Sequence, residues 1–373
     1  MKFRFLLVLC LVFLGTITRS IDFQGYLRNS IWNTYENGEF YSIQNTFNLN
    51  IVHSMDNARL KINPVLYHTQ EQEPEKSNLD DLLREAYIDL STPFLDIRIG
   101  KQQIIWGKAD GVFITDIVSP KNLTRFLLPD FEEIRMGITA IKFNHQIGNH
   151  GVEAIWIPAF TPNELPDHSS IWKRIPSFPI TPTYDLSQKK IKQNLKNGEF
   201  FLKYSAMTSM IDFELIGGYH FDDEPAMHQT RTYAAGNLTG IILTPQHHRM
   251  GVVGGSFSAT LFEGFVLRSE GAYYFNQYFT DLNPTNQDGL IKKNYLHYLA
   301  GIDFSLFSLD MSLQIIQEWI PEHLPTQAQD SLTTTMTFLV KKLLFRDRLT
   351  LEVFSYIETN PFNSLIKPKI TYS

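Results

Sequence analysis

The stretch LHYLAGIDFSL, residues 296–306, decides the fold, because its chemistry alternates at every second position. The even positions are apolar, as at Ile302 and Phe304, while polar residues such as Asp303 and Ser305 lie between them. This period of two predicts a β-strand with one apolar and one polar face. Four further segments with the same alternation are 43–51, 211–221, 309–315 and 348–353. The sequence therefore predicts an all-β protein.

Two all-β architectures place such strands differently. A soluble sandwich or solenoid buries the apolar faces, whereas a transmembrane barrel turns them to lipid and keeps the polar faces in its lumen. The predicted strands, of about 9–13 residues, suit a tilted bilayer crossing and exceed the usual ~5–6 residues of globular strands. Tight and long connections alternate along the chain, and aromatic residues gather at the strand ends, as they do at membrane interfaces. These features favour the barrel.

Counting the alternating segments predicts a single antiparallel transmembrane β-barrel of about 16 strands, with both termini on the periplasmic side. The expected strands are 23–32, 42–52, 59–67, 83–91, 94–106, 135–144, 151–158, 198–206, 210–221, 249–260, 263–275, 292–306, 309–320, 331–343, 347–358 and 365–373. Helix is expected only as a short turn or two within residues 120–135. The segments 159–197 and 222–248 are expected to be long loops.

The first twenty residues have the features of a secretory signal peptide. Lys2 and Arg4 precede an apolar run that is too short to span a bilayer as a helix. We therefore expect residues 1–20 to be removed and 21–373 to form the barrel. The single cysteine, Cys10, lies within the signal, so the exported chain would have no disulfide framework.

The charge balance limits the possible partners. Removing the predicted signal takes away three basic residues and leaves 30 against 39 acidic ones. A net charge of about −9 argues against nucleic acid as a partner.

The segment after residue 95 tests a different interpretation, a phosphate-binding loop. Such a loop has four residues between its first glycine and the Gly-Lys pair, followed by Ser or Thr. Here six residues separate Gly100 from Gly107 and Lys108, and Ala109 follows. The nucleotide interpretation is therefore excluded. In a barrel, this segment is instead a wall strand that leads into a long charged loop, residues 107–134.

That loop has two possible positions. It could fold inward and constrict the pore, or it could be a surface loop with solvated charges. With the polar faces of the strands, it supplies the residues that we expect to face the lumen or the pore. These are Asp96, Arg98, Gln102, Lys108, Asp110, Asp116, Arg125, Arg135, Asp212, Glu214, Arg268, Glu270, Asp303, Gln314, Arg348 and Glu352.

Several blocks of the sequence resemble one known family. They are REAYIDL (84–90), IRIGKQQIIWGKADGVFITDIVSPKN (97–122), WIPAFTPNELP (156–166), HHRMGVVGGSFSA (247–259), VLRSEGAYY (266–274), GIDFSL (301–306) and LQIIQEWI (313–320). The chain is similar over nearly its whole exported length to the outer-membrane family called domain of unknown function 1302. The resemblance implies an outer-membrane barrel of a Gram-negative-type bacterium. Members often accompany periplasmic lipid-carrier-like proteins and exporters of the resistance-nodulation-division type, which implies hydrophobic cargo.

The resemblance supplies no catalytic residues, and the sequence offers few of its own. No H-E-x-x-H motif occurs, and the serines of residues 254–258 lack the second glycine of a nucleophile elbow. His247 and His248, like the pair His145 and His150, invite attention as ligands or bases, but we interpret them as solvated loop histidines. The acidic run 222–224 could bind a divalent cation, although an exposed acidic loop is the simpler interpretation. We expect no enzyme, no cofactor and no metal.

The sequence thus predicts a pore or translocation barrel of the cell outer membrane for small or hydrophobic, lipid-like solutes. The alternatives are a binding or adhesion barrel with long outer loops, and an outer-membrane hydrolase. Expected partners are outer-membrane lipid, the barrel-assembly machinery and a periplasmic lipid carrier or exporter. The last strand contains Pro368 and does not end on an aromatic residue. We therefore expect a C-terminally shortened form of a barrel of about 18 strands.

Overall fold

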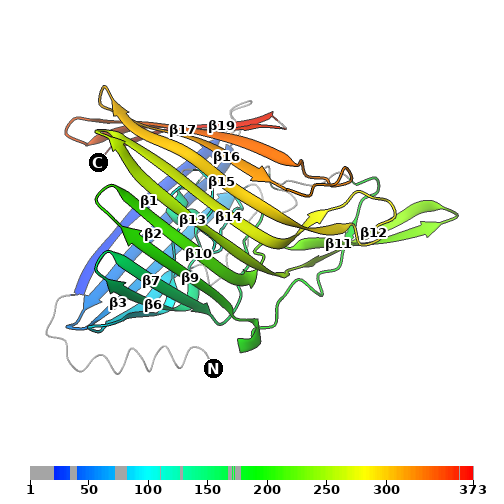
Figure 1. The fold of residues 1–373 in the computed structure, drawn as a ribbon, viewed down its shortest axis with the longest axis horizontal. Helices are drawn as coiled ribbons and strands as arrows, with labels where there is room; N and C mark the ends of the chain where they lie inside the picture. Colours follow the sequence, from blue (N-terminus) through cyan, green and yellow to red (C-terminus); the bar gives the residue numbers. More distant parts are fainter. Residues whose placement is uncertain are drawn as a thin grey trace. The chain divides into compact units, whose positions relative to one another are not determined.

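The computed structural model describes residues 21–33, 40–71, 82–109, 111–126, 129–166, 170, 172, 178–360 and 362–372. The predicted signal peptide, residues 1–20, and the predicted pore residue Asp110 lie outside the described residues. The described chain is almost entirely strands and connections (Figure 1). No helix in these ranges is long and apolar enough to span a membrane.

The main sheet holds 16 strands in the order β1-β2-β3-β4-β5-β6-β7-β9-β10-β13-β14-β15-β16-β17-β18-β19. The chain divides into two compact units, Met1–Gln103 with Thr139–Ile141, and Ile104–Ile138 with Lys142–Ser373. The strands of the first unit are β1 (Ile21–Asn33), β2 (Phe40–Ser54), β3 (Ala58–Glu71), β4 (Leu83–Ser91) and β5 (Asp96–Gln102). Each strand of this unit pairs antiparallel with the next one along the chain.

The remaining strands of the sheet begin with β6 (Ile138–Ile147), β7 (His150–Ile157), β9 (Glu199–Met207) and β10 (Ile211–Phe221). They continue with β13 (Arg249–Phe262), β14 (Phe265–Thr280), β15 (Leu290–Leu306), β16 (Leu309–Trp319), β17 (Leu332–Leu344), β18 (Leu349–Thr359) and β19 (Phe362–Tyr372). Helix in the part described is limited to the single turn α2 (Phe131–Ile134), the 3₁₀ turn η3 (Leu195–Asn197) and the 3₁₀ residue Leu82. The prediction of an all-β chain with this antiparallel sheet is confirmed, and each of the predicted strands overlaps an observed one.

Burial in the second unit is the reverse of that in a soluble protein. In β16, Leu313 is 43% exposed, whereas Gln314 beside it is 1% exposed. In β17, Met336 is 41% exposed and Thr337 is 2% exposed. An exposed apolar face next to a buried polar face is the arrangement of a barrel wall in lipid.

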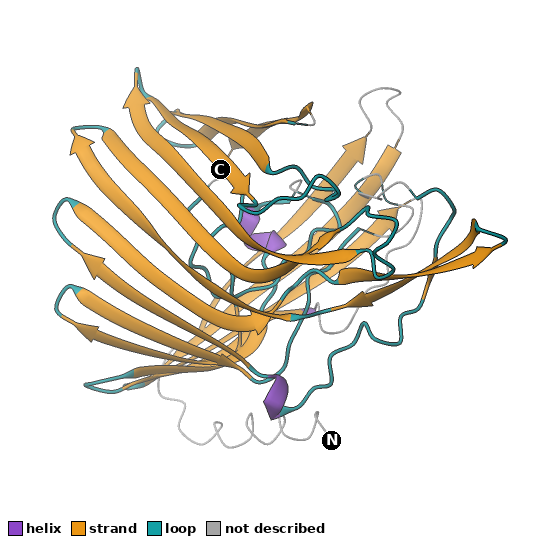
Figure 2. Ribbon diagram, turned by 45° about the vertical axis from the view of Figure 1, so that its right-hand side comes forward, coloured by secondary structure: helices purple, strands orange, loops and turns teal. Residues whose placement is uncertain are grey.

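The connections alternate between tight turns and long segments. Phe307 and Ser308 form the two-residue turn between β15 and β16, and their φ angles of 52° and 59° are those of a type I′ turn. Such turns follow one another along one end of the strands in Figure 2, and the long connections leave the other end. The predicted asymmetry is confirmed within the second unit.

The strand expected over 94–106 is shorter than predicted. β5 ends at Gln102, and the backbone N–H of Ile104 donates to Ser119 Oγ at 2.8 Å instead of to a neighbouring strand. Gly100, with a φ of 133°, lies so close to β4 that a Cβ would be 2.2 Å from the carbonyl oxygen of Ala86. Only glycine fits there, as the sequence suggested for a bend at this position.

The segment 222–248 was expected to be a loop, and this prediction is wrong. It holds β11 (Ala226–Ala234) and β12 (Asn237–Gln246), which form a hairpin, and β8 (Thr183–Tyr184) joins β12 in a small second sheet. Ala235 and Gly236, with φ angles of 49° and 81°, make the two-residue turn. Alternation in this segment is weak because threonine and glycine occupy many positions, so the strand signal was missed.

Candidate functional site

The long segment Ile104–Ile138 of the second unit packs against the polar face of the sheet. Residues 114–121 are all buried, with Ile114, Ile117 and Val118 at their apolar centre. A loop with a buried apolar centre is not a solvated surface loop. Of the two positions left open by the sequence, the structure shows the inward one.

Trp106 attaches the start of this loop to β7 and β9. Its indole Nε1–H donates to Glu153 Oε1 at 2.6 Å, and its ring meets Phe201 edge-on at 6.1 Å between centroids. Lys203 Nζ lies 5.4 Å from the indole centroid, within the range of a cation–π contact. Lys142 pairs with the same Glu153 carboxylate at 3.3 Å.

Glu270 on β14 makes the second attachment. Its carboxylate accepts hydrogen bonds from the backbone N–H of Lys108 at 2.5 Å and from Thr115 Oγ1 at 2.7 Å. Arg268, on the same strand, donates to the carbonyl oxygen of Lys108 at 2.8 Å. Hydrogen bonds to charged side chains are the stronger kind, so β14 holds both ends of the residue 108–115 segment.

Asp116 holds the loop together from within. Its carboxylate pairs with Arg135 Nε at 2.5 Å, and both side chains are buried. The backbone N–H of Trp106 donates to the same carboxylate at 3.3 Å, and Lys121 Nζ donates to the carbonyl oxygen of Asp116. These bonds join the start, middle and end of the loop.

The loop also reaches strands far from β7. Gly111, with a φ of 85°, lies so close to β18 that a Cβ would be 2.3 Å from Phe354 Cζ. β7 and β18 are eight steps apart in the strand order, about 38 Å along a flat sheet. The five residues from Trp106 to Gly111 span at most about 18 Å. The sheet of the second unit therefore curves around the loop, as Figure 2 shows.

Charged side chains surround the loop on this concave face. Lys108 Nζ lies 3.4 Å from Glu214, and Lys203 lies 3.9 Å from the same carboxylate. Arg268 pairs with Asp303 at 2.6 Å. The face thus carries acids and bases in pairs, a polar surface suited to water and solutes.

The structure brings together seven of the predicted pore residues around the loop. They are Lys108, Asp116, Arg135, Glu214, Arg268, Glu270 and Asp303. Arg125 is also on the loop and is buried. Gln314 is buried beside them on β16, where it accepts from Thr337 Oγ1 at 3.3 Å. Asp212 and Glu352 lie on β10 and β18 and are partly exposed.

Arg348 is an exception. It was expected on a strand facing the lumen, but it lies in the turn before β18, which begins at Leu349, and is exposed. The turn begins with three consecutive residues of positive φ, Phe345 to Asp347, so the strand starts later than alternation suggested.

Three predicted pore residues belong to the first unit. Arg98 pairs with Asp89 at 2.6 Å, and its guanidinium lies 4.0 Å from the Tyr87 ring centroid. Gln102 is fully buried and donates to the carbonyl oxygen of Ala140 at 3.1 Å. Asp96 is exposed at the start of β5.

Sequence reasoning missed three residues of the site: Trp106, Glu153 and Lys203. Alternation could have found them, because Trp106 continues the even-numbered polar face of 96–102, and the other two are polar positions within predicted strands.

The interpretation of His247 and His248 as solvated is wrong. His247 is buried, and its Nδ1 lies 2.7 Å from the carbonyl oxygen of Asp222. His248 Nε2 lies 2.7 Å from His228 Nε2. The acidic run is likewise not fully exposed: burial raises the pKa of Asp222 to about 7 and that of Asp223 to about 8. Among the described residues, no group of three or more His, Cys, Asp or Glu side chains is arranged to hold a metal ion.

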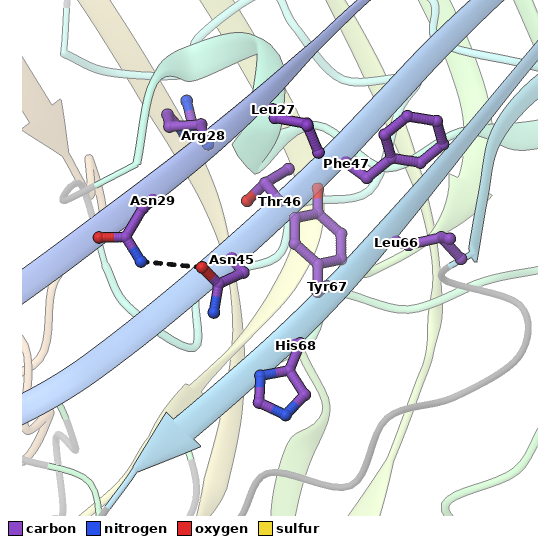
Figure 3. A pocket seen from close by; sticks show the side chains of 9 residues that line it. All are labelled: Leu27, Arg28, Asn29, Asn45, Thr46, Phe47, Leu66, Tyr67 and His68. Atoms are coloured by element: carbon purple, nitrogen blue, oxygen red, sulfur yellow. Dashed lines mark hydrogen bonds between the residues drawn. The ribbon is translucent and has the colours of Figure 1, made fainter.

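A hollow of about 480 Å³ lies on β1, β2 and β3 of the first unit (Figure 3). Leu27, Phe47 and Leu66 line it, and Leu27 is 83% exposed. Asn29 Nδ2 donates to Asn45 Oδ1 at 2.8 Å at its edge. The hollow is open on an exposed apolar face, so it is not an enclosed ligand cavity.

Solved structures with a similar fold include a porin, OmpF, and the outer-membrane protein OmpT. A porin refined at 1.8 Å resolution aligns with a TM-score of 0.52 and 10% identity over 95% of this chain and 99% of its own. OmpF of Salmonella typhi, in complex with daunomycin, aligns with a TM-score of 0.50 and 10% identity. The alignment covers 94% of this chain and 97% of OmpF. Outer-membrane-expressed OmpT of Vibrio cholerae aligns with a TM-score of 0.50 and 11% identity. The alignment covers 92% of this chain and 89% of OmpT. At this identity the likeness shows the fold alone.

The fold and the reversed burial therefore define an antiparallel β-barrel protein with a porin-type fold. Residues 27–340 match the family described as "Protein of unknown function (DUF1302)", and the chain belongs to that family. The resemblance drawn from the sequence blocks is confirmed. No curated protein matches the chain.

Proposed function

We propose that this protein is a non-catalytic pore or translocation barrel of the outer membrane, and that the loop Ile104–Ile138 narrows its passage. The observation that carries the proposal is the bonding of this loop to the polar face of the sheet, through Trp106, Glu270 and the Asp116–Arg135 pair. A porin-type fold supplies the passage, and a loop held at several points sets its width.

Two kinds of surface support small or lipid-like solutes as cargo. Paired charges such as Arg268 with Asp303 line part of the concave face. Farther along the loop, Phe126 stacks on Trp172 with centroids 6.2 Å apart and meets Tyr356 edge-on at 6.3 Å. Aromatic groups beside paired charges can bind an amphipathic molecule along both of its parts. The family resemblance points in the same direction.

Planar-bilayer recording tests the proposal. Deleting residues 112–130 should raise single-channel conductance and the uptake of an alkyl-chain solute into vesicles, while the protein still shows the heat-modifiable gel mobility of a folded barrel. A deletion of equal length in the β11–β12 hairpin, residues 227–245, is the matched control and should leave conductance unchanged. Equal permeability of the wild type and the loop deletion would contradict the narrowing role. No conductance in any form would contradict the pore.

A surface-binding barrel is the second candidate, and the hairpin favours it. β11 and β12 lie outside the main sheet, and the side chains of Tyr233 and Ile242 are exposed on them. The hairpin deletion separates the two candidates, because it should abolish cell adhesion only if the hairpin is a binding surface.

A further inference from the structure

Two imidazole rings outside the pore loop point their Nε2 atoms at each other. His228 on β11 and His248, between β12 and β13, have these atoms 2.7 Å apart. His228 Nδ1 lies 2.7 Å from Asp288 Oδ1, in the connection between β14 and β15. Strand β11 and two connections of the second unit therefore meet at one row of hydrogen-bonded side chains, Asp288–His228–His248.

The Asp288 carboxylate settles the proton on His228. A carboxylate accepts, so His228 Nδ1 carries the proton and, in the neutral ring, Nε2 presents its lone pair. The backbone supports this arrangement, because the N–H of Gln229 donates to the carbonyl oxygen of Asp288 at 2.9 Å. A carboxylate on the far nitrogen of a histidine is the arrangement that orients metal-binding histidines.

We propose that His228 and His248 bind a divalent transition-metal cation through their Nε2 atoms, with Asp288 as the positioning residue. Without a cation, one proton must lie between the two Nε2 atoms. A cation needs both Nε2 lone pairs, so on binding the His248 proton moves from Nε2 to Nδ1 and the ring stays neutral. The two histidines supply two ligands, and water or a solute completes the coordination.

The geometry needs only a small adjustment. Two imidazole nitrogens, each about 2.0–2.1 Å from a tetrahedral cation, lie roughly 3.3 Å apart, so the rings must separate by about half an ångström. His228 is partly exposed, with 19% of its side chain accessible, so the pair is open to ions from solution. Imidazole suits copper and zinc, with the copper(II) ion bound more tightly.

The groups that face the pair set its charge. Tyr278 packs against His248 with ring centroids 4.2 Å apart, and Lys292 Nζ lies 4.9 Å from the Tyr278 centroid. The charges of Lys292 and His247 oppose a cation, and the Asp288 charge favours it.

A bound cation would fasten the hairpin to the end of the barrel. β11 carries one ligand, and the other precedes β13, while Asp288 belongs to the connection between β14 and β15. Cation binding should therefore protect the hairpin from proteolysis. This consequence does not depend on whether the barrel conducts.

Calorimetry with Cu²⁺ and with Zn²⁺ on the folded, detergent-solubilised full chain tests the proposal. His228→Ala and His248→Ala should each weaken binding at least about tenfold, and Asp288→Asn should weaken it by about 10–100-fold. His323→Ala is the matched control, because His323 lies on another loop against the carbonyl oxygen of Gln329, and it should bind as the wild type does.

Electron paramagnetic resonance of the Cu²⁺ form provides a readout that a loss of stability would not mimic. The wild type should show coupling to two imidazole nitrogens, and each single-histidine variant to one. If neither cation binds the wild type, or if His323→Ala loses as much affinity as His228→Ala, the proposal is overturned. The pair is then a hydrogen bond only.

Discussion

The wall strands and the inward loop of the second unit place the same kinds of side chain in opposite environments. On β16 and β17, the apolar Leu313 and Met336 are exposed, and their polar neighbours are buried. In the loop, Ile114 and Ile117 are buried and Lys108 is exposed. The wall meets lipid on its outer face, whereas the loop meets water and the polar wall, so each region turns its apolar side chains away from water in a different direction.

The difference shows what holds each region in place. A wall strand needs its backbone ladder and a lipid-compatible face, and its inner side chains can pair among themselves. The loop has few backbone hydrogen bonds to neighbouring strands. Its position therefore depends on individual side-chain bonds such as those of Asp116 and Glu270. Substitutions in the loop should therefore act through single partners, and substitutions on the wall through the bilayer.

The largest effect is expected inside the loop, at Asp116→Ala. Removing this carboxylate breaks its ion pair with the buried Arg135 guanidinium, and breaking a buried pair costs about 3–5 kcal/mol. The loop should come away from the wall while the barrel remains folded. Limited proteolysis should then cut within 104–138 at a protease concentration that leaves the wild type whole. Equal protection of the two proteins would show that the pair does not hold the loop.

The wall gives the next largest effect. Ile302→Arg should destabilise the folded barrel by about 2–4 kcal/mol if the position lies near the bilayer midplane, because the guanidinium would have to enter lipid. Ser305→Arg, at the turn end of the same strand, is the control and should be tolerated. The measurement is the denaturant midpoint of the protein folded in lipid vesicles. If both variants unfold at the wild-type midpoint, the outer face is not in lipid.

A smaller effect is expected at the contact between loop and wall. Glu270→Gln keeps an acceptor but removes the charge that Lys108 and Thr115 bind, and hydrogen bonds to charged groups are worth about 1.5–3 kcal/mol. The expected result is a noisier single-channel current, because the residue 108–115 segment is held less firmly. Asp310→Asn, at a tight turn, is the control. If the current through Glu270→Gln is no noisier than that of the wild type, then Trp106 and Asp116 alone hold the loop in place.

The sequence was sufficient for the wall because alternation is a local signal that lipid imposes on every strand. All the main strands were located from it, and their polar faces supplied most of the site residues, including Glu270 and Arg268. The bonding of the loop was not predictable in this way. Which carboxylate Thr115 reaches depends on the curvature of the sheet and joins residues 155 apart in sequence.

Two predictions, those for Arg348 and His248, are wrong because alternation reports only local structure. Arg348 was placed on a strand because alternation cannot show where three residues of positive φ end a turn. The sequence predicts a solvated His248 because its partner, His228, lies on a hairpin whose weak alternation gives no strand signal. The predicted signal peptide, residues 1–20, and the prediction of about 18 strands in a longer form stay predictions.

A further effect, on the pH dependence of stability, is expected in the connection after β10, where burial raises the pKa of Asp223 to about 8 and Lys121 partly opposes this. An unfolded aspartate titrates near about 3.9. Between about pH 4 and pH 8, the unfolded chain therefore loses this proton while the folded protein keeps it, so stability falls as pH rises. Asp223→Asn imitates the neutral form and removes that loss. The melting temperature of the variant should exceed that of the wild type by an amount that grows from about pH 4 to pH 8 and is constant above this range.

The matched control for this prediction is Glu322→Gln, because Glu322 lies on another connection of the same unit and its side chain is 84% exposed. Its melting temperature should follow that of the wild type at every pH, since the substitution changes only an exposed side chain. A difference between Asp223→Asn and the wild type that shrinks with rising pH would mean that Asp223 is charged in the folded protein. The carboxylate would then be stabilised by Lys121, and the connection after β10 would be held by an ion pair in place of a buried neutral acid.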